Sequence, residues 1–337
     1  MARRGGWRRA GSRRHFRYLD SHGNRITDES KLARIESLRI PPAWTDVWIS
    51  PNARAKLQAT GVDAAGRRQY LYHPEHRASQ EQAKYDRLVR FAERLPEIRV
   101  AMGEHMTHDP LDVDRVCALA IRLVNLAWFR VGSDRYSRSS RTYGVTTLTR
   151  RHVTVRGRRV TFKFRAKSGT MIRRSLEDAE LAEALKALLA EDGARVFRYE
   201  RDGELVNLTG PRLNEYVREH MGDEFTIKDF RTWGGTLLAA TGLAEHEPPE
   251  TEAEGKRVLA AVMRKVGAQL ANTPAVARAS YVSPAVIEQY LDGRTLDDFR
   301  PRHLRVVKAT DIGLDPDEQA LVSLLRSWRI RRARAAA

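Results

Sequence analysis

The sequence predicts an α+β fold, with a small, mainly β domain over residues 1–82 and a larger, mainly α domain over residues 83–337. Three observations lead to this prediction. The chain of 337 residues is long for a single core, and its hydrophobic content of 42% is enough to build two. Short strand-like segments between turn residues fill the first domain. Apolar residues at three- and four-residue spacing dominate the second.

The chain opens with "MARRGGWRRAGSRRHFRY", in which arginines come in pairs and no acidic residue occurs. We expect this stretch to be a mobile basic arm that contacts phosphate groups. Its amphipathic character is poor, which argues against an organelle transit peptide.

Strand signals follow the arm. "DVWIS" ends before Pro51, and "LQATGVDAAGRRQYLYH" alternates around Gly61 and Gly66. Pro41 and Pro42 break any helix between the arm and these strands. The polar stretch "PEHRASQEQAKYDRLVRFAERL" predicts a helical connector into the second domain.

Helix signals dominate the second domain. In "DPLDVDRVCALAIRLVNLAWFRVG" we expect Asp109 as N-cap, Pro110 at the first helical position and Gly132 just past the end. A hairpin interrupts the helices, because apolar residues alternate on either side of Gly157 in "HVTVRGRRVTFKFRAKSGT". Further helices are expected in "SLEDAELAEALKALLAEDG", "PRLNEYVREHMG", "EAEGKRVLAAVMRKVGAQL", "SPAVIEQYLDG" and "DPDEQALVSLLRSWRIRRARA".

Charge and composition narrow the class of protein. Sixty Lys and Arg residues against 43 Asp and Glu give a net charge of +17, which indicates a polyanionic partner, most often nucleic acid. Ribosome association or an anionic membrane surface would fit the same charge. No apolar stretch is long enough to span a membrane. The single cysteine, Cys117, excludes a disulfide framework and a Cys-rich zinc site, and favours a reducing, intracellular location.

Several enzymatic motifs are missing. The chain has no G-x-x-x-x-G-K-[ST] phosphate loop and no G-x-G-x-x-G. Asp112 and Asp114 resemble the paired carboxylates of magnesium-dependent nucleases, but residues two apart on a helix point to different sides. The helix macrodipole explains them more simply. We therefore expect no metal and no cofactor.

Without a metal, chemistry on nucleic acid needs a protein nucleophile among positive side chains. A tyrosine phenol has a pKa near 10, so attack on a phosphodiester requires surroundings that favour phenolate. Arginine guanidinium groups stabilise the negative charge that gathers on the non-bridging oxygens in the transition state, and a lysine can protonate the leaving alkoxide. These residue types occur in "FRVGSDRY" (Arg130), "FKFRAKSGT" (Lys167), "IKDFRTWGGT" (Arg231) and "LANTPAVARASYVSP" (Asn272 and Tyr281).

These segments resemble the type IB DNA topoisomerases, specifically the small poxvirus-like enzymes and their bacterial relatives. The resemblance runs from "IPPAW" (Ile40 to Trp44) to "NTPAVARASYV" (Asn272 to Val282), and the order of the segments agrees. It implies a small β domain and a catalytic domain of the tyrosine recombinase and type IB topoisomerase type.

The resemblance also implies roles. Tyr281 would form a 3′-phosphotyrosyl bond, Arg130 and Arg231 would hold the scissile phosphate, and Lys167 would be general acid toward the 5′-hydroxyl. Asn272 stands where the viral enzymes have histidine, and would donate a hydrogen bond to a non-bridging oxygen. Ala166 replaces a glycine that is common in the family. Further DNA contacts are expected from Lys228 in the family's K-x-x-R, and from Gln69, Tyr70, Tyr72, Gly132 and Tyr136.

Each residue taken alone has an ordinary structural explanation. Arg130 and Arg231 could be helix-end or salt-bridge partners, and Lys167 a solvated lysine. Asn272 could be the N-cap of the helix that starts at Thr-Pro. Tyr70 and Tyr72 could face a core from a plain strand. Only the joint pattern favours catalysis.

The resulting expectation is a monomeric enzyme of the bacterial cytoplasm, associated with the nucleoid. It would clamp double-stranded DNA, nick one strand, let it rotate and reseal it without ATP or metal. Two alternatives stay open. A tyrosine recombinase or integrase shares the chemistry but typically carries H-x-x-R, where this chain has Lys228 three residues before Arg231. A non-catalytic DNA-binding protein is the other.

Overall fold

The computed structural model describes residues 5–12, 15–300 and 313–336. Its contacts divide the chain into two compact units, Met1–Asp86 and Arg87–Ala337. The division falls inside helix α2 (Pro74–His105), a little beyond the 82/83 boundary expected from the sequence. Helix α2 therefore begins in one unit and ends in the other.

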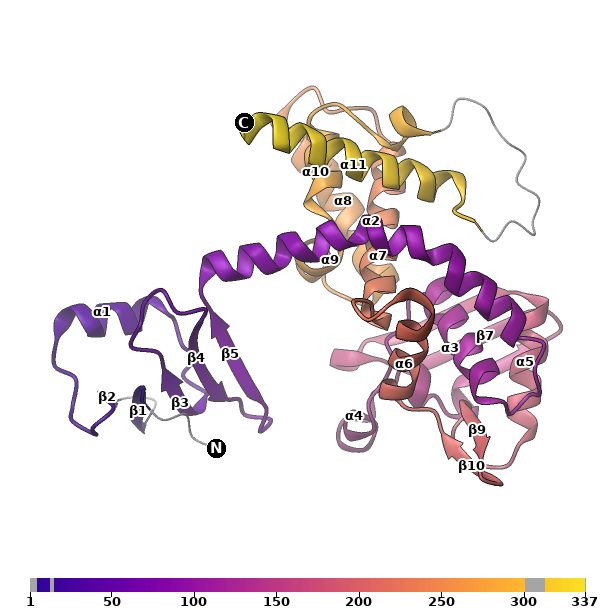
Figure 1. The fold of residues 1–337 in the computed structure, drawn as a ribbon, viewed down its shortest axis with the longest axis horizontal. Helices are drawn as coiled ribbons and strands as arrows, with labels where there is room; N and C mark the ends of the chain where they lie inside the picture. Colours follow the sequence, from indigo (N-terminus) through magenta and orange to yellow (C-terminus); the bar gives the residue numbers. More distant parts are fainter. Residues whose placement is uncertain (1–4, 13–14, 301–312, 337) are drawn as a thin grey trace. The chain divides into compact units, whose positions relative to one another are not determined.

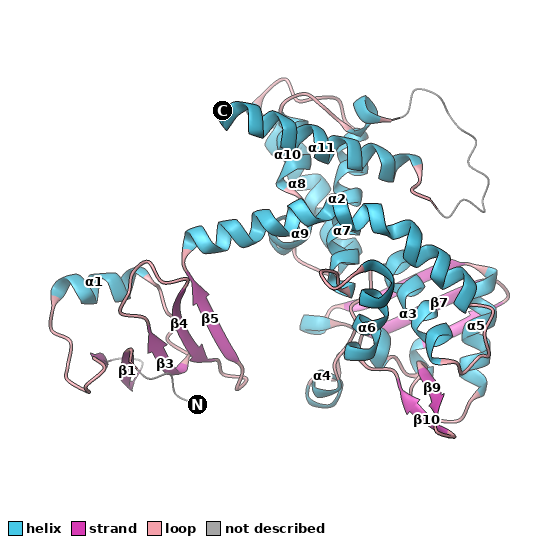
Figure 2. Ribbon diagram, in the orientation of Figure 1, coloured by secondary structure: helices cyan, strands magenta, loops and turns pink. Residues whose placement is uncertain are grey.

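An antiparallel sheet of five strands forms the N-terminal unit (Figure 1, Figure 2). The strand order is β2-β1-β3-β4-β5. Ile35 from helix α1 packs with Ile49 and Ala59 from the sheet, and all three are almost fully buried. The elements are β1 (Trp7–Ser12), β2 (His15–Leu19), α1 (Glu29–Ser37), β3 (Thr45–Ile49), β4 (Leu57–Val62) and β5 (Arg68–Tyr72). The small, mainly β domain is thus confirmed.

The mobile basic arm was a wrong prediction for most of its length. Strands β1 and β2 form a hairpin, and β1 also pairs with β3. Trp7 is buried in the core, and Arg9 lies over the Phe16 ring at 4.1 Å while donating to the carbonyls of Pro41 (3.1 Å) and Trp44 (2.6 Å). The aromatic residues between the arginines supply the apolar face that the prediction neglected. Residues 1–4, 13 and 14 lie outside the described residues.

Helices make up most of the second unit, which also contains two small sheets (Figure 2). The helices are the later part of α2, α3 (Val113–Ala127), α4 (Asp134–Ser139), α5 (Ala179–Ala190), α6 (Gly210–Met221), α7 (Ile227–Ala244), α8 (Glu252–Leu270), α9 (Pro274–Tyr281), α10 (Pro284–Leu291) and α11 (Pro316–Ala336). The sheets are β6 (Val153–Arg156), β7 (Arg159–Arg165) and β8 (Met171–Glu177), in that order, and the pair β9 (Arg198–Arg201) and β10 (Glu204–Asn207). The expected hairpin around Gly157 is confirmed as β6 and β7.

Helix α3 starts and ends at other residues than expected. Its N-cap is Asp112, whose side chain accepts from the backbone N–H groups of Asp114 and Arg115. Asp109 instead accepts from the Asp112 N–H in the preceding turn. The helix ends at Ala127, before Gly132, because Trp128 adopts the left-handed conformation (φ 51°). Capping by Asp112 agrees with the structural explanation of the paired carboxylates.

Helix α7 is the central element of this unit. It is buried over most of its length and packs against α3, α6, α8, α9, α10 and α11. A helix that is apolar nearly all round belongs in a core. The polar residues on its buried faces are therefore fixed in place, and Arg231 is one of them.

Two absences hold for the part of the chain that the structure describes. None of its helices has the length and apolar character needed to cross a membrane. Nor do any three or more His, Cys, Asp or Glu side chains gather there in a way that could hold a metal ion.

Candidate active site

Two helix C-termini form the framework of the site. Helix α3 ends at Ala127 and α8 ends at Leu270, and the next residue of each, Trp128 (φ 51°) and Ala271 (φ 50°), is left-handed. Non-glycine residues rarely adopt this conformation. The last carbonyls of both helices lack intrahelical partners and carry the negative end of the helix dipole.

Arginines satisfy these carbonyls. Arg231 donates to Trp128 O and, at 2.8 Å, to Leu270 O. Arg130 donates to Leu270 O and Ala271 O, both at 3.4 Å. The two helix ends thus compensate guanidinium charges that would otherwise repel each other. Burial, followed by the charge of Arg130, lowers the pKa of Arg231 to about 10.

Tyr281, the last residue of α9, lies against this cluster. The Arg231 guanidinium carbon is 5.0 Å from the centre of the Tyr281 ring. Burial alone would raise the pKa of the Tyr281 phenol, but the charges of Arg231, Arg130 and Lys228 and a hydrogen bond from Arg231 together lower it below its ordinary value. The site therefore stabilises the phenolate relative to that of a free tyrosine, the direction that nucleophilic attack requires.

Asn272 faces the arginines and is not a helix cap. Thr273 caps α9 instead, since its side chain accepts from the Val276 N–H. The amide oxygen of Asn272 accepts from Arg130 at 2.6 Å, so its amide nitrogen points the other way. That nitrogen is buried and has no hydrogen-bond partner, like Nε of Arg231. Unsatisfied buried donors are costly, and both suit an anionic acceptor.

The backbone of Tyr281 is fixed to α7 by residues that the sequence reasoning missed. The fully buried Thr236 hydroxyl lies 3.1 Å from Tyr281 O and accepts from the Ser283 N–H. A Cβ on Gly235 would come within 2.9 Å of Tyr281 Cβ. A glycine here lets α9 approach α7 closely. The signal was the Gly-Gly-Thr that follows Arg231 in "IKDFRTWGGT".

Lys167 lies in a turn that reaches the cluster of Arg130, Arg231, Asn272 and Tyr281, but its side chain is not part of that cluster. It lies in the turn between β7 and β8, and its side chain is exposed. The neighbouring Ala166 is buried and lines the same cleft as Arg130 and Arg231. Ala166 has φ −93°, which suits any residue, so the turn does not need the family's glycine. The structure brings the turn to the cleft but leaves the Lys167 amine in solvent.

Lys228 is exposed on α7, one helical turn before Arg231. It is among the cations that lower the pKa of Tyr281, so the two side chains are electrostatic neighbours.

The candidates in the N-terminal unit lie on β5. Tyr70 and Tyr72 are 49% and 47% exposed, and their rings are stacked with centres 6.3 Å apart. They therefore do not face the core. Gln69 donates to Asp63 at 2.8 Å within the β4–β5 turn, so its side chain already has a partner.

Gly132 and Tyr136 belong to the loop after Arg130. Gly132 has φ 108°, and a Cβ there would lie 2.7 Å from Thr147 Oγ1, which explains the glycine by backbone geometry. The Val145 N–H donates to Arg130 O, so the loop returns to fix the arginine's backbone. Tyr136 is 41% exposed on α4.

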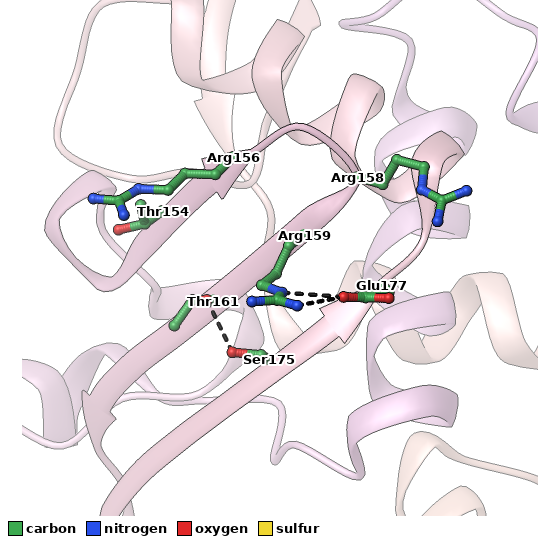
Figure 3. Close-up of a pocket in the computed structure, with 7 residues that line it drawn as sticks. All are labelled: Thr154, Arg156, Arg158, Arg159, Thr161, Ser175 and Glu177. Carbon is green, nitrogen blue, oxygen red and sulfur yellow. Dashed lines mark hydrogen bonds and ion pairs between the residues drawn. The ribbon is translucent and has the colours of Figure 1, made fainter.

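An arginine-rich hollow lies on the β6-β7-β8 sheet, apart from the residues that line the cleft (Figure 3). Arg159 pairs with Glu177, and Thr161 bonds Ser175 across the strands. Arg156 and Arg158 add further positive charge at the Gly157 turn. None of the candidate catalytic residues lines this hollow.

Comparison with known proteins gives consistent matches. A family profile described as "Eukaryotic DNA topoisomerase I, catalytic core" matches residues 73–295, and one described as "Bacterial DNA topoisomerase IB, N-terminal domain" matches residues 15–63. The chain is 32% identical to "DNA topoisomerase 1B" of Acanthamoeba polyphaga mimivirus over 290 residues, 84% of this chain and 86% of the viral protein. It is 21% identical to "DNA topoisomerase 1B" of Vaccinia virus (strain Copenhagen) over 285 residues, 81% of this chain and 87% of that protein.

Proposed function

This chain belongs to the type IB DNA topoisomerase family, and we propose that Tyr281 is the nucleophile with which it cuts and reseals one strand of duplex DNA. The enzyme relaxes supercoiled DNA by transient single-strand cleavage, strand rotation and religation, as the family does. The observation that carries the assignment to Tyr281 is the stack of its ring under Arg231, beside Arg130 and Asn272.

The Tyr281 phenol loses its proton to solvent, and its oxygen attacks phosphorus to form a 3′-phosphotyrosyl bond. The bond from phosphorus to the 5′ oxygen breaks, and Lys167 gives that oxygen a proton. Arg130, Arg231 and the free amide nitrogen of Asn272 donate to the non-bridging oxygens, where charge gathers in the transition state.

Lys167 has to approach the leaving 5′ oxygen in this step, and its side chain is exposed on the β7–β8 turn. The turn that carries it has Ser168 (φ 62°) and Gly169 (φ 79°) in left-handed conformations. We propose that DNA draws the Lys167 amine toward the cleft that Ala166 already lines.

Religation reverses the same step. One diester replaces another, so the exchange conserves bond energy and needs no ATP. Supercoil strain drives rotation between the two steps. In this proposal the arginines supply the positive charge at phosphorus, and no metal is required.

The finer proposals concern partners and location. We propose a monomer whose two units clamp double-stranded DNA, with Tyr70 and Tyr72 as contacts from the N-terminal unit and Lys228 and Tyr136 as contacts from the other. The net charge of +17 supports a polyanionic partner. The match of residues 15–63 to a bacterial domain supports a bacterial enzyme that works at the nucleoid.

The experiment that tests the function is relaxation of a supercoiled plasmid in EDTA without ATP. We expect the wild type to relax the plasmid and to form a covalent DNA adduct at Tyr281, identified by mass spectrometry of the DNA-linked peptide. Tyr281→Phe should bind DNA with wild-type affinity but neither relax it nor form the adduct. Relaxation by Tyr281→Phe at the wild-type rate would remove Tyr281 from the mechanism. A recombinase would need paired sites, and a binding protein would leave topology unchanged.

A further inference from the structure

A third arginine, Arg174 on β8, joins the same two helix ends and has no role in the chemistry described above. Its Nη1 donates to Ala127 O at 2.7 Å, at the end of α3. Its Nη2 donates to Gln269 O at 3.0 Å and to Gln269 Oε1 at 2.8 Å, near the end of α8. One planar guanidinium therefore spans the last turns of both helices.

Arg174 and Arg231 make two parallel connections between these helix ends. Arg174 bonds the carbonyls of Ala127 and Gln269, and Arg231 bonds the next carbonyl on each segment, those of Trp128 and Leu270. Arg130 and Asn272 lie two or three residues beyond these carbonyls. The positions of Arg130 and Asn272 thus depend on how the helix ends are held.

Arg231 is proposed to bind the scissile phosphate as well as the helix ends, whereas Arg174 bonds the helix ends alone. Both Nη atoms of Arg231 donate hydrogen bonds to backbone carbonyls, and Arg130 also donates to Leu270 O and Ala271 O. A phosphate bound to Arg130 and to the unpartnered Nε of Arg231 would neutralise part of the positive charge that now compensates the two helix ends. Two dipole ends of like sign would then face each other with less net positive charge between them.

We propose that Arg174 is a positioning residue, which keeps the ends of α3 and α8 together while Arg130 and Arg231 bind the scissile phosphate. The proposal rests on the proposed function. Arg174 comes from a strand rather than from either helix, and Arg174 pairs with Phe162 of β7 within the sheet. Phe162 is fully buried, so the sheet gives the guanidinium a rigid support.

The test is single-turnover cleavage of a duplex by Arg174→Ala, with DNA affinity measured in parallel. We expect the cleavage rate to fall by about 100-fold, the order that a ~1 Å misplacement of catalytic groups costs. DNA affinity should stay within about threefold, because Arg174 bonds protein carbonyls and not DNA. Arg173→Ala is the matched control: it removes the same charge from the adjacent, exposed position of β8 and should cleave like the wild type.

A substrate with sulfur in place of the bridging 5′ oxygen identifies where Arg174 acts. Sulfur needs no proton to leave, so this substrate should restore cleavage to Lys167→Ala but not to Arg174→Ala. Restoration of Arg174→Ala would place its effect at the Lys167 turn and overturn the proposal. So would a wild-type cleavage rate, or a loss of affinity as large as the loss of rate.

Arg174→Lys covers the case in which the alanine variant does not fold. A lysine keeps the charge but reaches only one helix end. The cleavage rate of Arg174→Lys should therefore be lower than that of the wild type and higher than that of Arg174→Ala, or, if Arg174→Ala does not fold, still measurable. Wild-type cleavage by Arg174→Lys would show that charge alone suffices and would overturn the proposal. Failure of the proposed function is seen separately, as an adduct formed by Tyr281→Phe.

Discussion

The acidity of Tyr281 is set by single residues whose effects oppose each other. Burial disfavours the phenolate, whereas Arg231, Arg130 and Lys228 favour it, and the cations prevail. Asn272 adds a donor that carries no charge and does not titrate. The pH dependence of cleavage should therefore report Tyr281 on its rising limb. The rate should fall again at higher pH, where Arg231 loses its proton, because burial lowers the pKa of Arg231 to about 10.

Lys228→Ala tests this assignment. Loss of a cation raises the pKa of Tyr281, so a higher pH is needed to reach the same fraction of phenolate. We expect the rising limb of the single-turnover rate to move to higher pH, with the falling limb unchanged. Lys186→Ala is the control, since Lys186 lies on α5 and pairs with Glu183 on the same helix. A rising limb that stays in place, or moves to lower pH, would contradict the role of Lys228.

At the scale of elements, the site is built where helices end. The ends of α3 and α8, the start of α7 and the end of α9 each contribute one part of it. The β7–β8 turn is different, because it carries Lys167 on its exposed side and Ala166 on its buried side. A turn can move its tip while its buried base stays fixed.

Lys167→Ala should expose the role of this turn. We expect cleavage of an ordinary duplex to fall by about 10²–10⁴-fold, the usual contribution of a general acid. The sulfur-bridged duplex should be cut at nearly the wild-type rate. Lys163→Ala, an exposed lysine of β7 outside the turn, should behave like the wild type on both substrates. If sulfur gave Lys167→Ala no benefit, Lys167 would not be the acid.

The sequence predicted those parts of the fold and site that local patterns encode. Apolar spacing gave α8 and α10 closely, and alternation around Gly157 gave β6 and β7. It failed for the first strands, where pairing with β3 turns an arginine-rich stretch into sheet. Arg174 could not be found, because its partners are backbone carbonyls 47 and 95 residues away. Carbonyls carry no sequence signal, and neither does the left-handed conformation of Trp128.

For the whole molecule, affinity for DNA combines charge with contacts that do not depend on charge. With a net charge of +17, the chain should neutralise several phosphates and release their counterions. A clamp that makes ~6–10 phosphate contacts loses about 10³–10⁵ in affinity between low and moderate salt. Relaxation should accordingly be inhibited by salt, and a flat salt profile would argue against the clamp.

The exposed pair Tyr70 and Tyr72 separates the two contributions. Aromatic contacts displace no counterions, so the double variant Tyr70→Ala, Tyr72→Ala should bind about tenfold more weakly, on the order of 1.4 kcal/mol, at every salt concentration. A plot of log affinity against log salt should shift down with its slope unchanged. Lys228→Ala should instead reduce the slope by about one, as loss of a single phosphate contact does. Affinity equal to the wild type in the double variant would leave β5 outside the DNA interface. A changed slope would mean that the tyrosines act by placing nearby arginines and do not contact DNA themselves.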